Sequence, residues 1–152
     1  MRMMVLQAVI IGGLPLPAAA NELLIKYRGE ADQCLQSVDE RGGEALCRGL
    51  LFAVCQPVGG IEACMQAEAQ FWEEQVVLQF EGAVEEMTRQ DEAYPLAENR
   101  AEALAEAQVA WRAFQVAECE VMALTTGSDA YCYESTGFAR ALRLIDLQEP
   151  LQ

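Results

Sequence analysis

Residues 61–87 read IEACMQAEAQFWEEQVVLQFEGAVEEM, and their apolar side chains recur at spacings of three, four or seven residues. This spacing predicts one face of a helix of about seven turns. The helix is expected to end before Pro95, whose fixed φ and missing N–H suit the first turn of a following helix. The apolar positions are Ile61, Met65, Trp72, Val76, Phe80, Val84 and Met87.

A second long helix is predicted over residues 96–124. Gly127 and Ser128 end this segment, and Ser128 or Asp129 is placed to cap a third helix. The expected apolar stripe of the second helix consists of Leu104, Ala107, Trp111, Phe114, Val121 and Leu124. The third helix keeps the helical period at Tyr131, Phe138, Leu142 and Ile145.

Two shorter helices are predicted ahead of the long ones, at residues 22–38 and 44–54. No segment alternates apolar and polar residues for long, and the commonest residues are good helix formers. Amphipathic helices joined by short loops pack as antiparallel neighbours. The sequence therefore predicts an all-α fold, a small antiparallel helical bundle built on a long helical hairpin. No linker divides residues 21–152, so we expect one domain there.

The first twenty residues have the pattern of an export signal. Arg2 gives a positive start, residues 3–14 are mostly apolar, and Ala18-Ala19-Ala20 follows a break that contains two prolines. This order predicts a signal peptide at residues 1–20, with a buried N-terminal helix as the alternative. The apolar run is shorter than the about 20 residues that span a bilayer. We expect a soluble mature chain, periplasmic or secreted, with no membrane insertion after cleavage.

Six cysteines lie in the expected mature chain, and an even number in a small exported protein indicates disulfides. None are spaced as C-x-x-C, which disfavours a redox pair or a zinc ribbon. Fifteen pairings are possible. Three of the expected turns, at residues 42–43, 57–60 and 125–129, are each flanked by two cysteines, so local pairs are favoured. The expected pairs are Cys34–Cys47, Cys55–Cys64 and Cys119–Cys132.

Charge narrows the classes of function. The chain has 24 acidic residues, 10 basic residues and no histidine, for a net charge of −14. This balance disfavours binding to nucleic acid and to anionic lipid, and the lack of histidine removes His-dependent nucleophiles and metal sites. The acidic residues crowd the predicted hairpin, either as a solvated face or as a surface that attracts a basic partner. No nucleophile, base and orienting group come together, so we expect no enzyme, no cofactor and no metal. A hydrolase with paired carboxylates is the remote alternative.

Other side chains have two interpretations each. Tyr131 and Tyr133 flank Cys132 and form either an exposed aromatic binding edge or an anchor for the last helix. Arg112 and Arg140 are expected to pair with carboxylates. The aromatic residues at helical spacing are expected in the core rather than around a cofactor, and they are Phe71, Trp72, Phe80, Trp111, Phe114 and Phe138.

Residues 103–119, ALAEAQVAWRAFQVAEC, resemble the hallmark of the LprI-like lysozyme-inhibitor family. That hallmark is L-x-x-A-Q-x-A-W-x-x-[FY]-R-D-x-x-C, followed by a Gly-rich turn and a second Cys. The matching positions are Leu104, Gln108, Trp111, Phe114, Cys119, Gly127, Ser128 and Cys132. Upstream, Cys64, Glu68 and Trp72 are similar to the family's C-x-x-x-E-x-x-x-W-D. The resemblance covers residues 34–144, since Cys34, Cys47 and Cys55 look like the extra cysteines of some exported members.

The chain departs from this family pattern at polar positions. Gln115-Val116 stands where the family has Arg-Asp, and Glu73 stands where it has Asp after the tryptophan. Val76-Val77 and Phe80 replace a Leu-Asn pair and a tyrosine. Thr126 reduces the usual Gly-Gly-Ser turn to Thr-Gly-Ser.

The resemblance implies an exported protein that binds and inhibits lysozyme, an enzyme that is often basic. Inhibition would proceed by occlusion, in which an acidic face or turn covers the substrate cleft. The expected contacts are Glu118, Glu120, Thr126, Gly127, Ser128, Asp129, Tyr131 and Tyr133. The alternative is a non-inhibitory scaffold or assembly protein of the cell envelope, which an exposed apolar patch would favour. The sequence leaves the oligomeric state open.

Overall fold

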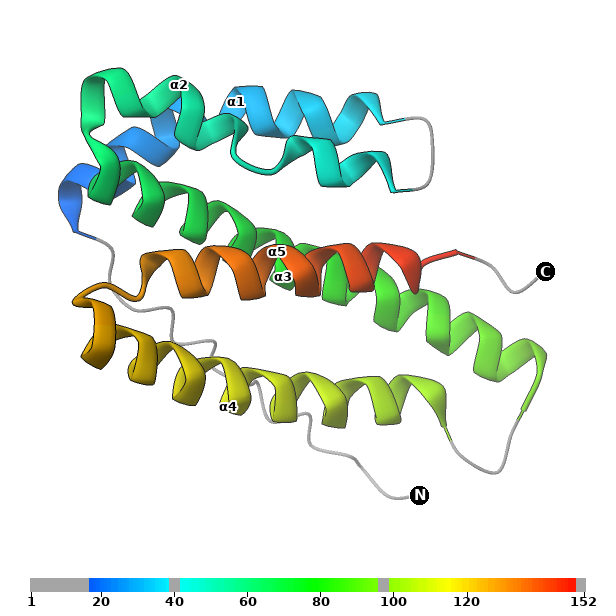
Figure 1. Cartoon of the computed structure of the whole chain (residues 1–152). Coiled ribbons are helices and arrows are strands. Elements are labelled where there is room, and N and C mark those ends of the chain that lie inside the picture. Colours follow the sequence, from blue (N-terminus) through cyan, green and yellow to red (C-terminus); the bar gives the residue numbers. More distant parts are fainter. Residues whose placement is uncertain (1–16, 39–41, 96–98, 150–152) are drawn as a thin grey trace.

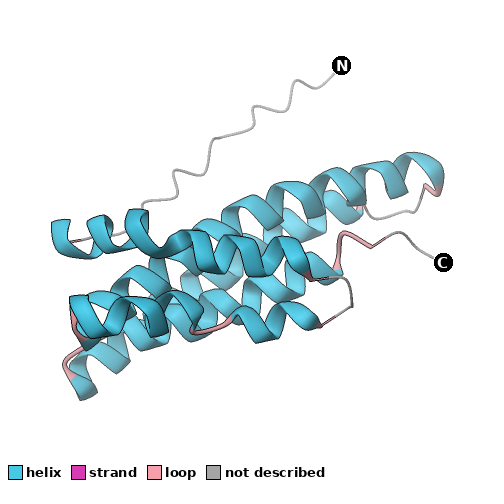
Figure 2. Cartoon of the chain, turned by 90° about the horizontal axis from the view of Figure 1, so that it is seen from above, coloured by secondary structure: helices cyan, strands magenta, loops and turns pink. Residues whose placement is uncertain are grey.

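The computed structural model describes residues 17–38, 42–95 and 99–149, so most of the predicted signal peptide lies outside the described residues. Every regular element in this part of the chain is helical, and Figure 2 shows helices joined by short loops. The all-α prediction is confirmed. The elements are α1 (Ala18–Ser37), the 3-10 helix η1 (Gly43–Cys47), α2 (Leu50–Gly59), α3 (Ile61–Ala93), α4 (Arg100–Thr126) and α5 (Ala130–Asp146).

Helix α3 is the centre of the bundle. Helix α5 packs along it, and α1 and α2 pack against its first half (Figure 1). Gly137 of α5 lies directly against Trp72, since a Cβ at this glycine would stand 3.4 Å from the Trp72 Cβ. Because α5 takes the main place on α3, α4 lies at the edge of the bundle, on the side away from α1 and α2.

The core forms where these helices meet. Trp72 is fully buried and makes edge-on contacts with Phe71 and Phe138, at ring-centroid distances of 5.1 Å and 4.9 Å. Such aromatic pairs add about 0.5–1.5 kcal/mol beyond their buried area. The aromatic residues of α3 therefore lie in the core as predicted.

The predicted helix at residues 44–54 is wrong. The structure instead has η1, a break at Arg48 and Gly49, and then α2, which continues through Pro57 to Gly59. Gly49 has φ +80°, a left-handed conformation that glycine adopts without steric cost and that a helix interior does not contain. The break lets the Glu68 carboxylate accept hydrogen bonds from Gly49 N–H and Phe52 N–H, both at 2.8 Å.

The prediction for α3 is confirmed, but the start of α4 is not. Pro95 does not open α4, which begins at Arg100 with Asn99 as its N-cap. The Asn99 side chain accepts a hydrogen bond from Glu102 N–H at 2.9 Å, a typical capping contact. Residues 96–98, where this helix was expected to begin, lie outside the described residues.

The apolar stripe predicted for α4 was expected to be buried, and most of it is exposed. Leu104 is buried and Trp111 is half-buried, but Ala107, Phe114, Val121 and Leu124 are exposed. The inner side of α4 instead carries Leu104, Gln115 and Cys119. The physical reason is a polar contact layer between α4, α3 and α5, which turns the larger apolar side chains outward.

The three disulfides pair Cys34 with Cys47, Cys55 with Cys64, and Cys119 with Cys132, which are the pairs expected from the turns. They join α1 to η1, α2 to α3, and α4 to α5. Such crosslinks indicate an oxidising compartment. Helix α1 begins at Ala18 and so includes the last three residues of the predicted signal peptide. None of the described helices combines the length and apolar character that crossing a bilayer requires.

Candidate binding site

The turn between α4 and α5 is held by several local bonds. Gly127 has φ +80°, and its N–H donates to Ala123 O at 2.9 Å, which closes α4. The Ser128 hydroxyl accepts a hydrogen bond from Ala130 N–H at 3.3 Å and donates to Glu62 at 2.8 Å. The Ser128 side chain therefore contacts the first backbone N–H of α5 and ties the turn to the first turn of α3. Asp129 occupies the N-cap position without a side-chain capping bond.

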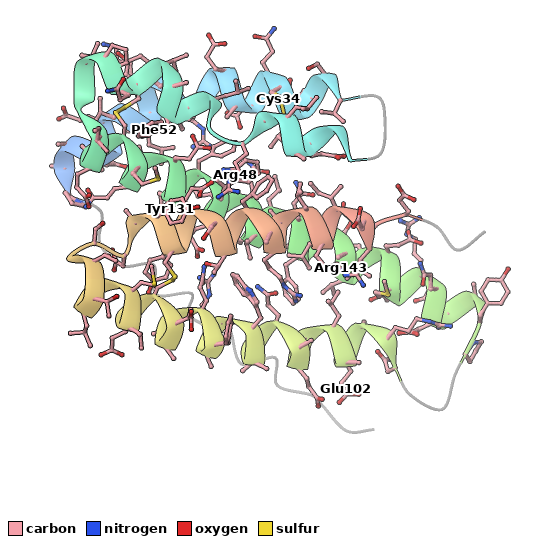
Figure 3. The ribbon with its side chains drawn as sticks, viewed as in Figure 1. Cys34, Arg48, Phe52, Glu102, Tyr131 and Arg143 are labelled. Carbon is pink, nitrogen blue, oxygen red and sulfur yellow. A yellow bond between two sulfur atoms is a disulfide. The ribbon has the colours of Figure 1, made fainter. Side chains whose placement is uncertain are left out.

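The two tyrosines expected at this turn point to different sides of α5. Residues two positions apart on a helix, such as Tyr131 and Tyr133, are separated by about 200° around its axis, so they cannot share one edge. Tyr131 is 58% exposed and lies beside Arg48 and Phe52 on the side of α2, as Figure 3 shows. Tyr133 is half-buried. Burial, followed by the carboxylates of Asp129 and Glu73, raises the pKa of the Tyr133 phenol.

We expect Tyr133 to ionise later than an ordinary tyrosine, in a phase that Tyr133→Phe removes and Tyr131→Phe leaves in place. Tyrosinate absorbance measured against pH gives this directly. A pKa raised in the folded state means that the unfolded chain loses the proton first. Stability is therefore fully present below the usual tyrosine pKa of about 10 and falls as pH rises through the folded pKa. A titration that Tyr133→Phe leaves unchanged would contradict the environment described for this ring.

Tyr131 lies at the edge of a cleft of about 310 Å³ between the start of α2 and α5. Two buried carboxylates line this cleft. Glu134 forms a two-bond ion pair with Arg48, at 2.7 Å and 2.8 Å, and this contact raises the pKa of the Arg48 guanidinium. Glu68 is bonded to backbone N–H groups and to the Trp72 indole. The lining residues are Arg48, Gly49, Phe52, Met65, Glu68, Tyr131 and Glu134.

Both carboxylates are hydrogen-bonded to other groups of the protein, so they are not free acids. The cleft is therefore a concave surface with Tyr131 at its edge. The geometry suits contact with another molecule by packing and hydrogen bonding. Across residues 17–38, 42–95 and 99–149, no group of three or more Cys, Asp or Glu is arranged to hold a metal ion.

A buried polar network joins α3, α4 and α5 behind the turn. Gln115 is fully buried, and its amide nitrogen donates to Glu73 Oε1 at 2.5 Å and to Thr136 Oγ1 at 2.9 Å. Arg112 donates to Glu73 Oε2 and, at 2.6 Å, to Gln115 Oε1. The expected ion pair of Arg112 is thus present. This network and the Cys119–Cys132 disulfide fix how α4 sits on the bundle.

The expected carboxylate partner of Arg140 is not found among the described residues. Arg140 Nε donates to the amide oxygen of Gln108 at 2.8 Å, and its Nη2 atom is buried with no hydrogen-bond partner in the described part of the chain. Burial, together with the neighbouring Arg143, lowers the pKa of Arg140. The reason is geometric: Arg140 faces α4 at Gln108 and Trp111, where the described side chains present no acid.

The expected contact residues therefore form one cluster and two outliers. Glu120 is exposed near the turn and contributes, with Asp129, to the electrostatic environment of Tyr133. Glu118 is also exposed but lies about 160° around α4 from Glu120. Tyr131 lies with the cleft. We call the cluster at residues 126–129, together with Glu120 and Tyr133, the turn surface.

Sequence reasoning missed Arg48 and Glu134, which line the cleft. The two residues pair with each other across 86 positions of the sequence, and no local pattern marks either one. Glu68 was recognised only as part of the family motif.

Comparison with known proteins gives one match. A family model described as LprI, lysozyme inhibitor LprI, matches residues 56–149, which is more than half of the chain. The match includes α3, α4 and α5, the turn surface and the Cys119–Cys132 disulfide. No curated protein and no solved structure matches the chain.

Proposed function

The chain belongs to the LprI lysozyme-inhibitor family, and from this membership we propose that it is an exported protein that binds a lysozyme-like enzyme and inhibits it by occlusion. The family match over residues 56–149 is the observation that carries this proposal. The family description is that of an inhibitor, in line with the expectation that the chain has no catalytic role of its own.

Charge supports a basic partner. The net charge is −14, and cleavage of the proposed signal peptide, residues 1–20, removes Arg2 and makes the chain one unit more negative. Opposite net charges speed association and lose influence as salt rises. Glu120 and Asp129 place carboxylates at the turn surface itself, with Glu62 beside them through its bond to Ser128.

Rigidity supports occlusion as the mechanism. The turn surface is held by the Cys119–Cys132 disulfide, the Gly127 closure of α4 and the Ser128–Glu62 bond. A surface that is already ordered loses less conformational entropy on binding, so more of the contact energy goes into affinity. In this proposal the turn surface enters or covers the partner's substrate cleft. Hydrogen bonds hold it there, and substrate is excluded without any covalent reaction. The disulfides and the signal pattern support a periplasmic or secreted location.

We test the proposal by measuring lysozyme activity against increasing amounts of oxidised residues 21–152. We expect inhibition near stoichiometric dose, weakening at high salt. The variant Glu120→Lys/Asp129→Lys should raise the half-inhibitory concentration about tenfold, which is about 1.4 kcal/mol. Removing two carboxylates and adding two cations at the turn surface converts attraction of a basic enzyme into repulsion.

The matched control is Glu85→Lys/Glu92→Lys, which makes the same charge change at exposed positions near the far end of α3. It should change the half-inhibitory concentration by less than about twofold, because a distant charge is screened within about 10 Å. If both double variants raise the half-inhibitory concentration equally, only the net charge of the chain matters and the turn surface has no specific role. No inhibition of any lysozyme type by the unaltered chain would remove the proposed activity altogether.

One observation favours the second candidate, a non-inhibitory scaffold or assembly protein of the envelope. Helix α4 exposes large apolar side chains, among them Phe114, Val121 and Leu124. Monomeric soluble proteins rarely leave contiguous apolar surface uncovered without a partner for it.

A further inference from the structure

The outer side of α4 carries a continuous apolar seam. Its members are separated by alternating steps of four and three residues over nearly the whole helix, and each one is exposed. This spacing is the heptad repeat by which one helix packs along another. We call these residues the α4 seam, and they are Ala103, Ala107, Ala110, Phe114, Ala117, Val121 and Leu124.

The α4 seam faces away from the bundle. The buried side of α4 is set by Leu104, Gln115 and Cys119, and the seam lies on roughly the opposite side of the helix. Figure 3 shows Glu102, at the first turn of α4, pointing away from α5. Among the described elements, α4 packs only on α3 and α5 to a significant extent, so none of them covers the seam.

The composition of the seam fits a close helical contact. Four of its seven members are alanines, which allow a second helix to approach closely, and the larger Phe114, Val121 and Leu124 provide knobs toward the C-terminal half. Solubility does not require this pattern, because a solvated face would carry polar residues at these positions.

The charges beside the seam are all negative. In the heptad, Glu106 and Glu120 precede the members Ala107 and Val121 on one flank, and Glu118 lies on the other. Of the two arginines of α4, Arg100 stands one heptad step before Ala103 and is paired with Asp91, and Arg112 is paired with Glu73. A partner that matches the seam must therefore bring positive charge to both flanks.

We propose that the α4 seam is a docking surface for a helix of another protein, one that carries an apolar heptad seam flanked by Lys and Arg. Apolar contact along the seam supplies affinity, and the acidic flanks select the partner by charge. No member of the α4 seam belongs to the turn surface, although Glu120 flanks the seam and is part of the turn surface. The inference does not depend on lysozyme inhibition.

A second copy of this chain fits the seam less well. Antiparallel pairing that aligns the two seams brings Glu106 of one copy toward Glu120 of the other, which is a like-charge contact at the flanks. Parallel pairing avoids that contact but places two chains of net charge −14 side by side. The acidic flanks thus favour a basic partner over self-association.

The test uses the whole oxidised chain and synthetic helical peptides of about four heptads, labelled for fluorescence anisotropy. One peptide has a Leu-rich seam with Lys and Arg flanks, a second has the same seam with Glu flanks, and a third has the basic flanks with a Ser-substituted seam. We expect the first to bind, the second not to bind, and the third to bind much more weakly.

Two variants of α4 give a matched comparison. Val121 belongs to the seam and is 56% exposed, whereas Val109 is off the seam and 55% exposed. Val121→Asp should weaken binding of the basic peptide at least about tenfold, and Val109→Asp less than about twofold. Both side chains are exposed, so both variants should keep the helical content and melting temperature of the parent chain.

Three results would overturn the proposal. Equal losses for the two aspartate variants would show that binding is merely electrostatic. Equal binding of the acid-flanked and base-flanked peptides would remove the charge argument. A dimer seen by sedimentation that Val121→Asp dissolves would assign the seam to a second copy. Lysozyme inhibition is measured on Val121→Asp and Val109→Asp as well. Peptide binding and lysozyme inhibition are separate readouts, so a failure of this proposal is distinguished from a failure of the proposed function.

Discussion

Replacing Glu68 by glutamine is expected to lower the free energy of unfolding by about 3 kcal/mol, because hydrogen bonds to buried charged groups contribute about 1.5–3 kcal/mol each. The Glu68 side chain is 1% exposed and accepts three hydrogen bonds, from Gly49 N–H, from Phe52 N–H and, at 2.9 Å, from the Trp72 indole N–H. All three partners are donors. A carboxamide has one oxygen only, and its NH2 group must face at least one of these donors.

The position of Glu68 also matters for α2. Its carboxylate stands at the N-terminus of that helix, where unpaired N–H groups and the helix dipole favour a negative charge. Glu68→Gln removes that charge as well as the bonds. Denaturant unfolding followed by circular dichroism measures the total loss. Hydrogen exchange at the Gly49 and Phe52 amides should speed up more than exchange within α4, because the damage is local to α2.

The matched control is Glu85→Gln, the same chemical change at an exposed position of the same helix. Surface changes of this kind stay within about 0.5 kcal/mol. If Glu68→Gln falls in the same range, the three bonds make no net contribution and the assignment of Glu68 as the residue that organises the α2 N-terminus is wrong.

The elements that were predictable from the sequence are those set by local rules. Helix α3 follows from its apolar period between Gly60 and Pro95, and it runs from Ile61 to Ala93 as expected. The disulfide pairs follow from turns that bring neighbouring cysteines together. Asp129 was one of the two residues expected to cap the third helix, and it occupies the N-cap position of α5 without a side-chain capping bond. In each case the residues that decide the structure lie within a few turns of one another.

The features that escaped prediction depend on contacts between distant segments. The break at Gly49 is stabilised by Glu68, which belongs to the next long helix. Helix α4 has apolar residues on both sides, so its period alone does not say which side faces α3 and α5. The buried side is settled by Gln115, whose partners Glu73 and Thr136 lie on two other helices.

The candidate site shows the same division. The residues of the turn were identifiable because glycine, serine and threonine between two cysteines mark a turn. The cleft was not, because Arg48 and Glu134 are 86 residues apart in the sequence. The two departures from the family pattern at Glu73 and Gln115 are neighbours in space, with a hydrogen bond of 2.5 Å between them. In sequence they are 42 residues apart and look independent.

Gln115→Glu is expected to lower the free energy of unfolding at neutral pH by about 3 kcal/mol, because a like charge is placed in a buried site without a new partner. The new carboxylate would face Glu73 Oε1, which now accepts a hydrogen bond from the Gln115 amide, and Arg112 alone would have to serve both acids. Thr136 would also lose the Gln115 amide as a donor.

The pH dependence of Gln115→Glu follows from the same contact. Two carboxylates in one site raise the pKa of one of them in the folded state. The unfolded chain then holds fewer protons than the folded chain between the two pKa values, so the variant gains stability as pH falls through that range. Gln115→Leu, which removes the amide but adds no charge, is the control and should lack this gain. Denaturant unfolding at pH 5 and pH 7 compares the two variants.

The exchange Glu73→Gln/Gln115→Glu should recover most of the stability that Gln115→Glu loses. One carboxylate and one amide remain, Arg112 still pairs with an acid, and the amide at position 73 can donate to the carboxylate at position 115. Glu73→Gln alone is destabilising, because Arg112 and Gln115 both need an acceptor there. The double-mutant cycle should therefore give a favourable coupling of about 2 kcal/mol, within the range found for residues in direct contact. Additive effects would mean that these positions do not interact, and the polar layer that turns the α4 seam outward would need another origin.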